Sequence, residues 1–522
     1  MHSATENAIR PCLFAAAMTA VCLGRGPAAR SQDTPLAGAK SMDDAATDHD
    51  RWPCWSGPRT TFVAPPTGIK LVNDLNKAKL VWQSDEITPM GKAHAARSGQ
   101  YTAGRHGGNQ QGKPSGGGGS VIVTGRRVYL SYYLPSGSVI APEVSGGRSF
   151  DEDSRRISAD DIVLCLDAET GKTVWKQVFE DNGVNIQAGK SPGYSGLTPC
   201  AIGKRIYALG TMMRIYCLDA KTGELVWETP TPRATEALEA AKQKALQEKR
   251  LAGHPYLAKQ GGKNLISAGG VLLVPVQRDL LGVDGQTGDV LWTVAGALGG
   301  TATPTRWTHA GNDYVIAAND EGTIRCIEPR SGKVTWTIED AGPNNVNVAV
   351  EGDLLVARAG SAEFPREGRK PEVRGLLGAW RISPERATMI WKHEDARYAL
   401  NHLRTPVLAE GYLYFSCDRG PVLCVEAATG KVVAEAEVPV PRLPGACSWA
   451  EGLLFVETDG SHMSMNLHMI KADPSDLRQL GETWLNPHPP TTSYVPAMCH
   501  AHVDGRLYVR GADGVYCYDL RR

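Results

Sequence analysis

The chain has 522 residues, and its 56 Lys and Arg residues balance 56 Asp and Glu residues, so its formal net charge at pH 7 is zero. Nucleic-acid-binding proteins normally carry a basic excess or a basic stripe; neither is visible here, so no nucleic-acid partner is expected. With 57 Gly, 33 Pro and 21% charged residues, the composition favours a β-rich protein with many turns. Because repeat folds do not follow the usual relation between length and domain number, internal repeats are sought first.

The N-terminus has the pattern of an export signal. Arg10 precedes an apolar stretch, residues 12–23, and small residues follow it. A stretch of about a dozen apolar residues is too short to span a bilayer but suits a signal peptide. We therefore predict a signal peptide over residues 1–31, an N-terminal extension over residues 32–78, and a periplasmic or secreted protein; a disordered N-terminal extension is the alternative. No later segment approaches the roughly 18 apolar residues of a membrane-spanning helix, so none is predicted.

Five stretches repeat one pattern, an alternating apolar strand, a turn and a second alternating strand. The first reads IVLCLDAETGKTVW. Thr-Gly or Ser-Gly supplies the positive φ that a tight hairpin needs, and the Asp or Glu before it can accept hydrogen bonds from the turn amides. The Trp after the glycine is expected to fill the space between neighbouring sheets. The five stretches end at Trp175, Trp227, Trp292, Trp336 and Ala434.

Two further units keep this layout without the glycine. They end at Trp391 and Trp484, and a turn containing Pro384 or Pro474 replaces Thr-Gly. Each unit also has an upstream hairpin that ends in an apolar strand, and the eight such strands predict eight four-stranded units. The upstream strands begin at Arg127, Arg205, Val271, Tyr314, Leu354, Tyr412, Leu453 and Arg506.

The last unit lacks a final strand, because the sequence ends at Arg522, whereas a matching strand, residues 79–83 (KLVWQ), has no unit of its own. A propeller closes when its N-terminus donates one strand to the last blade and leaves no free edge. We therefore predict an all-β fold, an eight-bladed β-propeller over residues 79–522 closed by an N-terminal strand. Strong helix formers at residues 233–250 predict a helical insert at about 231–256, between blades 2 and 3.

These features resemble the pyrroloquinoline-quinone-like (PQQ-like) propeller repeat, whose pattern is close to x-L-Y-A-L-D-A-x-T-G-x-x-x-W. The resemblance covers about residues 79–522 and implies the propeller fold. Residues 52–58 (WPCWSGP) also look like the Trp-Pro-x-Trp-Arg-Gly-Pro opening of secreted propellers of the planctomycete type, with Ser56 in place of Arg. The chain resembles BamB-type outer-membrane assembly lipoproteins in the repeat alone.

Twelve cysteines in an exported protein raise the question of disulfides. Five of them occupy one repeat position, and a single repeat position in different blades cannot bring sulfurs within bridging distance. A free cysteine behaves as a small buried hydrophobe. We therefore predict buried, free thiols at Cys165, Cys217, Cys326, Cys424 and Cys517.

Several cofactor and metal motifs are missing or incomplete. Quinone-dependent dehydrogenases of this fold have an adjacent cysteine pair, and the sequence holds neither Cys-Cys nor a Cys-x-x-Cys-His haem motif. No cofactor is predicted, PQQ included, because a fold does not imply a function. The glycine run at 116–119 lacks the Lys-Ser/Thr of a phosphate-binding loop. His500 and His502 could share one side of a strand, but no third ligand is evident, so we expect a surface hairpin there and no metal site.

The candidate binding residues lie at the mouth of the central channel, where residues just before each innermost strand point inward on one face. Such side chains suit an anionic or sugar-like ligand, since Arg binds carboxylates with two hydrogen bonds and His or Tyr can move protons. Solvated polar groups at a wet channel mouth are the alternative. The alignment of the upstream hairpins places these residues there: His106, Tyr194, Lys263, Asn345, Asn347, Asn401, His402, Arg404, Arg442 and Tyr494.

Three functions remain open at this point. The first, which we favour, is a BamB-like binding or scaffolding propeller that presents its funnel face to an envelope protein or a carbohydrate ligand. The second is a carbohydrate-active enzyme such as a polysaccharide lyase, in which Arg404 would neutralise a uronate and His402 would transfer a proton. The third is a quinone-dependent oxidoreductase. Whether the protein is an enzyme stays open, and a monomer is expected.

Overall fold

The computed structural model describes residues 52–89, 94–95, 101–102, 116–117, 119–139, 157–184, 198–232, 264–299, 302–344, 347–366, 369–394, 406–416, 421–438, 444–459, 465–485, 500–511 and 513–522. The chain divides into two units, Met1–Lys40 and Ser41–Arg522, and all described residues belong to the second. Among them, no helix is both long enough and apolar enough to cross a membrane. The predicted signal peptide lies outside the described residues.

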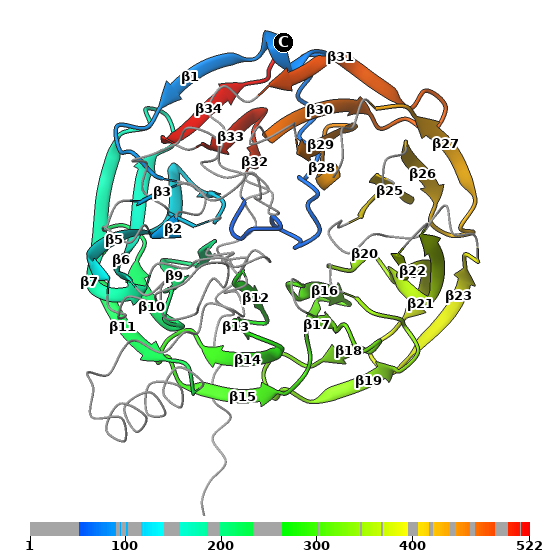
Figure 1. Ribbon diagram of the computed structural model, residues 1–522, viewed down its shortest axis with the longest axis horizontal. Helices are drawn as coiled ribbons and strands as arrows, with labels where there is room; N and C mark the ends of the chain where they lie inside the picture. The colour runs from blue at the N-terminus through cyan, green and yellow to red at the C-terminus, as the bar shows by residue number, and fades with distance from the viewer. Residues whose placement is uncertain are drawn as a thin grey trace, which may run out of the picture. The chain divides into compact units, whose positions relative to one another are not determined.

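Eight four-stranded antiparallel sheets, named blades 1 to 8, follow one another round a ring (Figure 1). The strands of each blade are given from the innermost to the outermost. Blades 1 to 4 comprise β4 (Ile122–Thr124), β5 (Arg127–Val139), β6 (Ile157–Asp167), β7 (Thr173–Val184); β8 (Cys200–Ile202), β9 (Arg205–Leu209), β10 (Arg214–Asp219), β11 (Leu225–Pro230); β12 (Ile266–Ala268), β13 (Val271–Val276), β14 (Asp279–Asp284), β15 (Val290–Val294); and β16 (Thr305–His309), β17 (Asn312–Ala318), β18 (Ile324–Ile327), β19 (Val334–Ile338).

Blades 5 to 8 comprise β20 (Ala349–Glu351), β21 (Leu354–Arg366), β22 (Arg369–Ile382), β23 (Ala387–Lys392); β24 (Val407–Ala409), β25 (Tyr412–Ser416), β26 (Val422–Glu426), β27 (Val432–Ala436); β28 (Pro444–Ala450), β29 (Leu453–Asp459), β30 (Met465–Lys471), β31 (Arg478–Leu485); and β32 (His500–Val503), β33 (Arg506–Arg510), β34 (Val515–Asp519), β1 (Lys79–Gln83). Outside the blades, β2 (His94–Ala95) pairs with β3 (Tyr101–Thr102), and η2 (Leu75–Lys77) is a single 3-10 turn. The expected all-β, eight-bladed propeller is confirmed, and the predicted upstream strands are the second strands of the blades.

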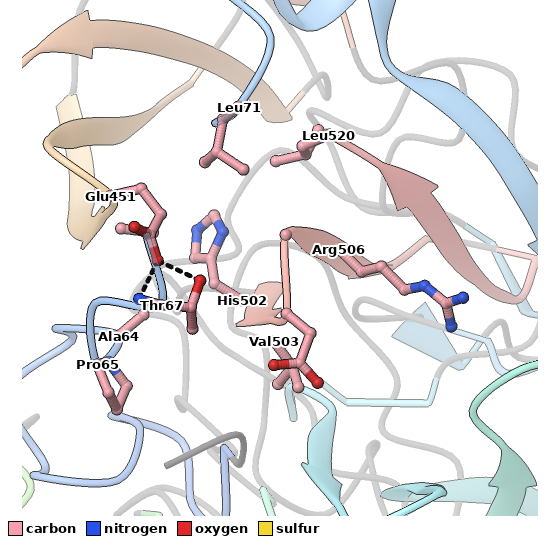
Figure 2. Close-up of a pocket in the computed structure, with 12 residues that line it drawn as sticks. Ala64, Pro65, Thr67, Leu71, Glu451, His502, Val503, Arg506 and Leu520 are labelled. Carbon is pink, nitrogen blue, oxygen red and sulfur yellow. Dashed lines mark hydrogen bonds between the residues drawn. The ribbon is translucent and has the colours of Figure 1, made fainter. Parts of the chain in front are cut away.

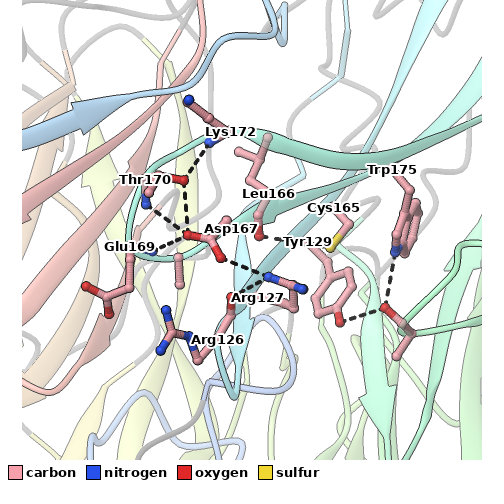
Figure 3. Close-up of polar contacts among 12 residues, drawn as sticks. Arg126, Arg127, Tyr129, Cys165, Leu166, Asp167, Glu169, Thr170, Lys172 and Trp175 are labelled. Atoms are coloured by element: carbon pink, nitrogen blue, oxygen red, sulfur yellow. Dashed lines mark hydrogen bonds and ion pairs between the residues drawn. The ribbon is translucent and has the colours of Figure 1, made fainter.

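The predicted turn chemistry is also confirmed, and Figure 3 shows it in blade 1. Asp167 Oδ1 accepts hydrogen bonds from the backbone N–H groups of Glu169 and Thr170, both at 3.1 Å. Its other oxygen receives a hydrogen bond from Arg127 at 2.9 Å. These bonds and the φ of +70° at Gly171 fix a tight turn between the third and fourth strands.

Repeat Trp residues join blade 8 to blade 1 and each of blades 1 to 5 to the next blade. The Trp175 indole donates a hydrogen bond to the Ala220 carbonyl of blade 2 at 3.1 Å, and its ring covers Gly223, where an added Cβ would lie 2.5 Å from the indole. Glycine is therefore required there by packing as well as by φ. The same indole-to-carbonyl bond recurs from Trp82 to Ala168, Trp227 to Gly285, Trp292 to Pro329, Trp336 to Ser383 and Trp391 to Ala427.

The core lies between the faces of neighbouring blades. Side chains of blades 1 and 2 share one apolar cluster, and those of blades 5 and 6 share another. The five repeat cysteines are buried and free, as predicted. Burial raises the pKa of Cys217, Cys326 and Cys424 to about 11 in each case, so these thiols stay protonated and packed.

The two faces of the ring differ in the turns that they carry. The first-to-second strand turns of all eight blades and the third-to-fourth strand turns of blades 1 to 7 lie on one face, called here the turn face. The connections between the second and third strands and between consecutive blades lie toward the opposite face, called here the funnel face. Most of the expected helical insert falls on a connection between blades and outside the described residues.

A segment ahead of the first blade, residues 52–72, runs inside the ring and is called here the strap; Figure 1 shows it in dark blue. Its WPCWSGP motif folds into a compact turn, in which the Trp52 indole donates to the Trp55 carbonyl at 3.1 Å. Trp52 is fully buried, and Ser56, where the resembling motif has Arg, is fully buried too. The motif is therefore a structural plug that leaves no room for an arginine at Ser56.

The strap leaves the channel between blades 7 and 8 and leads to the outer rim. Thr67 donates to Glu451 in the blade 7 turn through both its backbone N–H and its hydroxyl, at 2.6 and 2.7 Å. The Val72 N–H donates to the Leu520 carbonyl at 2.7 Å. After η2, strand β1 pairs antiparallel with β34 and supplies the fourth strand of blade 8.

Candidate functional site

The predicted funnel-mouth residues fall almost entirely outside the described residues. That group comprises His106, Tyr194, Lys263, Asn345, Asn401, His402, Arg404, Arg442 and Tyr494. Asn347 is described, and it lies just before β20, the innermost strand of blade 5. Its side chain is 3% exposed, so it is a buried group at the funnel-face end of this strand.

Asn347 links blades 4 and 5. Its Oδ1 accepts a hydrogen bond from the Thr303 backbone N–H, just before β16, at 2.9 Å. Its Nδ2, and the hydroxyl of Thr303, are buried without a hydrogen-bond partner among the described residues. Buried polar groups are almost always paired with protein, water or a bound ion, so these two donors mark a place where a further group fits.

Arg358 is the fifth residue of β21, the second strand of the same blade. Its backbone N–H donates to Asn344 Oδ1 at 3.1 Å. Arg358 is 3% exposed. Its Nη1 donates to the Pro343 carbonyl, whereas Nε and Nη2 have no hydrogen-bond partner among the described residues. Burial lowers the pKa of Arg358 to about 10, and the guanidinium still carries its charge at neutral pH.

Arg510 of blade 8 shows how an equivalent arginine is held when its partners are structural. Both residues are the fifth of the second strand in their blades. Arg510 is fully buried, and its two terminal nitrogens donate to the carbonyls of Gly119 and Pro89 at 2.6 Å each, with Ser131 and Gly116 further away. Arg358 has one carbonyl in place of these four, so its charge is available to an anionic group.

A second polar cluster, between blades 7 and 8, has the geometry of a serine–histidine–carboxylate relay. Ser448 Oγ lies 2.8 Å from His500 Nε2 and 3.0 Å from His502 Nε2. His500 Nδ1 lies 2.6 Å from Glu457 Oε1. The hydroxyl has one proton, so one histidine accepts it and the other must donate to Ser448 Oγ. If Nδ1 of His500 donates to Glu457, His500 is the acceptor and His502 the donor.

Burial decides what this cluster does. Ser448 and His500 are 0% exposed. His502 reaches the small pocket between the strap and blades 7 and 8, which Figure 2 shows, but Ser448 does not line it. Burial and the neighbouring His500 hold the pKa of His502 well below its usual range, so it is neutral. A serine that no substrate reaches cannot act as a nucleophile, and the cluster locks blade 7 to blade 8.

The expected location of His500 and His502, in a surface hairpin, was therefore wrong. Both lie on β32, the innermost strand of blade 8, and are buried, not in a surface hairpin. Alignment failed because the innermost strands are short and carry little of the repeat pattern. Among the described residues no group of three or more His, Cys, Asp or Glu could hold a metal ion.

Sequence reasoning also missed Arg358, although a signal existed. The fifth residue of the second strand is apolar in blades 2, 3 and 4 but polar in the other five. The five polar residues at this position are Ser131, Arg358, Ser416, Glu457 and Arg510. A polar residue at a repeat position that packs inward in other blades needs a partner, and this position holds Arg358, Arg510 and the carboxylate of the buried relay.

Comparison with known families agrees with the propeller fold. The family model described as outer membrane protein assembly factor BamB matches residues 70–248, 158–359 and 276–449. The chain belongs to this family. No curated protein sequence matches it.

Three solved structures are similar in fold. BamB from Moraxella catarrhalis is 14% identical, with 76% of this chain and 91% of that chain covered and a TM-score of 0.38. A europium-containing methanol dehydrogenase is 12% identical, with 91% and 99% covered and a TM-score of 0.40. The computationally designed Ika8 protein is 10% identical, with 85% and 99% covered and a TM-score of 0.47.

Proposed function

We propose that the protein is an exported binding or scaffolding module that holds an anionic group of its ligand at the funnel face. The observation that carries this proposal is the Arg358 guanidinium, which is buried and charged yet has two nitrogens without a partner among the described residues. A buried charge without a counter-charge costs free energy, which a bound carboxylate would offset through two parallel hydrogen bonds.

Other buried donors are compatible with the same chemistry. Asn347 Nδ2 and the Thr303 hydroxyl also have no hydrogen-bond partner among the described residues, and no ion pair joins Arg358 to a described carboxylate. By contrast, the one described cluster with the geometry of a catalytic relay is sealed between two blades. The described residues thus favour binding over covalent catalysis, in line with membership of the BamB family.

The test uses two carboxylate probes, oligogalacturonate and a glutamate-rich peptide of equal charge, with calorimetry for binding and ultraviolet absorbance for new unsaturated sugar ends. We expect one or both probes to bind without turnover, and Arg358→Gln to weaken binding by about ten-fold or more, which corresponds to about 1.4 kcal/mol. Arg358→Lys keeps the positive charge but cannot donate two parallel hydrogen bonds to a carboxylate, so its binding affinity should be intermediate.

The control is Arg386→Gln, which removes an exposed arginine from the turn face. It should bind both probes as the wild type does. Turnover by the wild type would favour the lyase alternative over a binding module. Failure of both probes to bind, or equal binding by Arg358→Gln, would overturn the proposal.

Two finer features of the fold belong with this proposal. We propose that β1 closes the ring, which its pairing with β34 supports, and that the region 231–256 adds a helical insert, which its composition supports. A signal peptide would export the protein to the periplasm or beyond, where an envelope protein or a carbohydrate would meet the funnel face.

A further inference from the structure

The strap shows how a peptide binds inside this ring. In each blade the innermost strand ends in a hairpin with the second strand, and the residue one before its last paired residue is called here the edge position. At Val123 in blade 1, the edge-position N–H and C=O bond to Trp52 at 2.9 and 2.7 Å. At Trp449 in blade 7 they bond to Phe62 and Ala64, both at 2.9 Å.

Blade 2 uses the same position. The Ala201 N–H donates to the Pro53 carbonyl at 2.8 Å. In these three blades the strap is therefore held on the inner edge of a sheet by backbone hydrogen bonds, the kind of bond that strand addition uses. In blade 4 the strap bonds two residues before the edge position, where the Arg306 N–H donates to Thr60 Oγ1 at 2.6 Å.

The strap leaves the sector of blades 4 to 6 unfilled. The edge positions there are Thr308, Val350 and Leu408, and all three line a cavity of about 320 Å³. No backbone hydrogen bond joins any of them to the strap within the described residues. Ligand pockets begin at about 300 Å³, and Thr308 is exposed, so the cavity is large enough and open to solvent at the turn face.

The charged residues that line the cavity indicate an acidic ligand. Arg59 of the strap and Arg306 of β16 both line it, and neither forms an ion pair with a described carboxylate. Arg59 is exposed, and Arg306 uses one terminal nitrogen on the Pro58 carbonyl. The third charged residue, Glu351, is already used, because its two oxygens accept from the Glu410 and Gly411 N–H groups at 2.9 Å each. Two cations thus face the free edges.

From this arrangement we infer that the turn-face end of the channel binds an extended acidic peptide of a partner protein. Its backbone pairs with the edge positions Val350 and Leu408, as the strap pairs with Val123 and Trp449. Its carboxylates pair with Arg59 and Arg306. This site lies at the other end of the channel from Arg358 and does not depend on the function proposed above.

The experiment uses the full chain and a fluorescein-labelled peptide of about six residues in which valine alternates with glutamate. Fluorescence anisotropy should show saturable binding, and the same peptide with lysine for glutamate should not bind. Arg59→Ala should weaken binding by about ten-fold. Arg386→Ala, on the same face but at the rim, should leave it unchanged.

Backbone pairing is tested on the peptide, so that the protein stays intact. N-methylation of alternate residues removes every second N–H and places methyl groups on one edge of the peptide strand. One of the two alternate patterns should abolish binding and the other should leave it unchanged. Equal binding by both patterns, binding that ignores Arg59→Ala, or no binding to the full chain would each overturn the inference.

Discussion

At the scale of single residues, a buried ionisable group has a shifted pKa when no opposite charge lies beside it. Asp161 on β6 is one such group. It accepts hydrogen bonds from the Thr211 N–H and hydroxyl, at 3.1 and 2.9 Å, and from the Tyr216 hydroxyl at 3.1 Å. Burial outweighs these bonds and raises the pKa of Asp161 to about 6.

This pKa predicts a pH dependence of stability. The folded protein keeps the Asp161 proton at pH values where the unfolded chain, with a pKa near 4, has lost it. The free energy of unfolding should therefore fall as the pH rises from about 4 to about 6, by roughly 3 kcal/mol in all. Asp161→Asn cannot titrate and should lack this fall. Denaturant unfolding of both proteins at a series of pH values checks the prediction.

Only the difference between the two proteins is diagnostic, because His502 acts in the opposite direction. Its lowered pKa makes stability fall as the pH drops below about 6.5, where the unfolded chain takes up a proton. That contribution is common to wild type and Asp161→Asn. Parallel stability curves for the two proteins would show that Asp161 is ionised in the folded state.

At the scale of elements, the glycine turn of one blade and the tryptophan of the blade before it form one joint wherever both are present. Gly332 in blade 4 has a φ of +70°, and an added Cβ would lie 2.5 Å from Trp292 of blade 3. Gly311, in another turn of the same blade, has a φ of +79° and open space around the Cβ position. The pair separates backbone strain from lost packing between blades.

Gly311→Ala should cost about 1–2 kcal/mol of unfolding free energy, from the left-handed backbone alone. Gly332→Ala should lower the unfolding free energy by about 2 kcal/mol more, because the Trp292 ring must move away from its packed position over residue 332. Thermal and denaturant unfolding measure both. Equal losses in the two variants would mean that the Trp–Gly contact adds nothing to the joint.

The elements also mark how far sequence reasoning reached. The third and fourth strands were predictable because Asp167, Gly171 and Trp175 each have a local chemical reason and recur in other blades. The innermost strands were not predictable, because a short strand such as β32 carries none of the repeat motif. His500, which lies on β32, was therefore assigned to the wrong element. The role of Trp52 in the strap depends on contacts with blades far along the chain, which no local pattern encodes.

At the scale of the whole molecule, the proposed closure of the ring by β1 would hold in place the blades that carry both arginine sites. Trp82 on β1 bonds to the Ala168 carbonyl at 3.0 Å and covers Gly171 of blade 1, so the N-terminal strand makes the joint between blades 8 and 1. Without it, β34 would present a free edge, which favours association between chains. Arg358 and the cavity at Arg306 need the blades held at fixed spacing.

The most direct test of this account is a comparison of two N-terminal deletions by analytical ultracentrifugation and thermal unfolding. Removal of residues 1–51 keeps the strap and β1, and should leave a monomer with the melting temperature of the full chain. Removal of residues 1–84 takes away both, and should lower the melting temperature by about 10 °C or more and produce oligomers. A deletion of residues 1–84 that stays monomeric and equally heat-stable would contradict closure of the ring by the N-terminal segment.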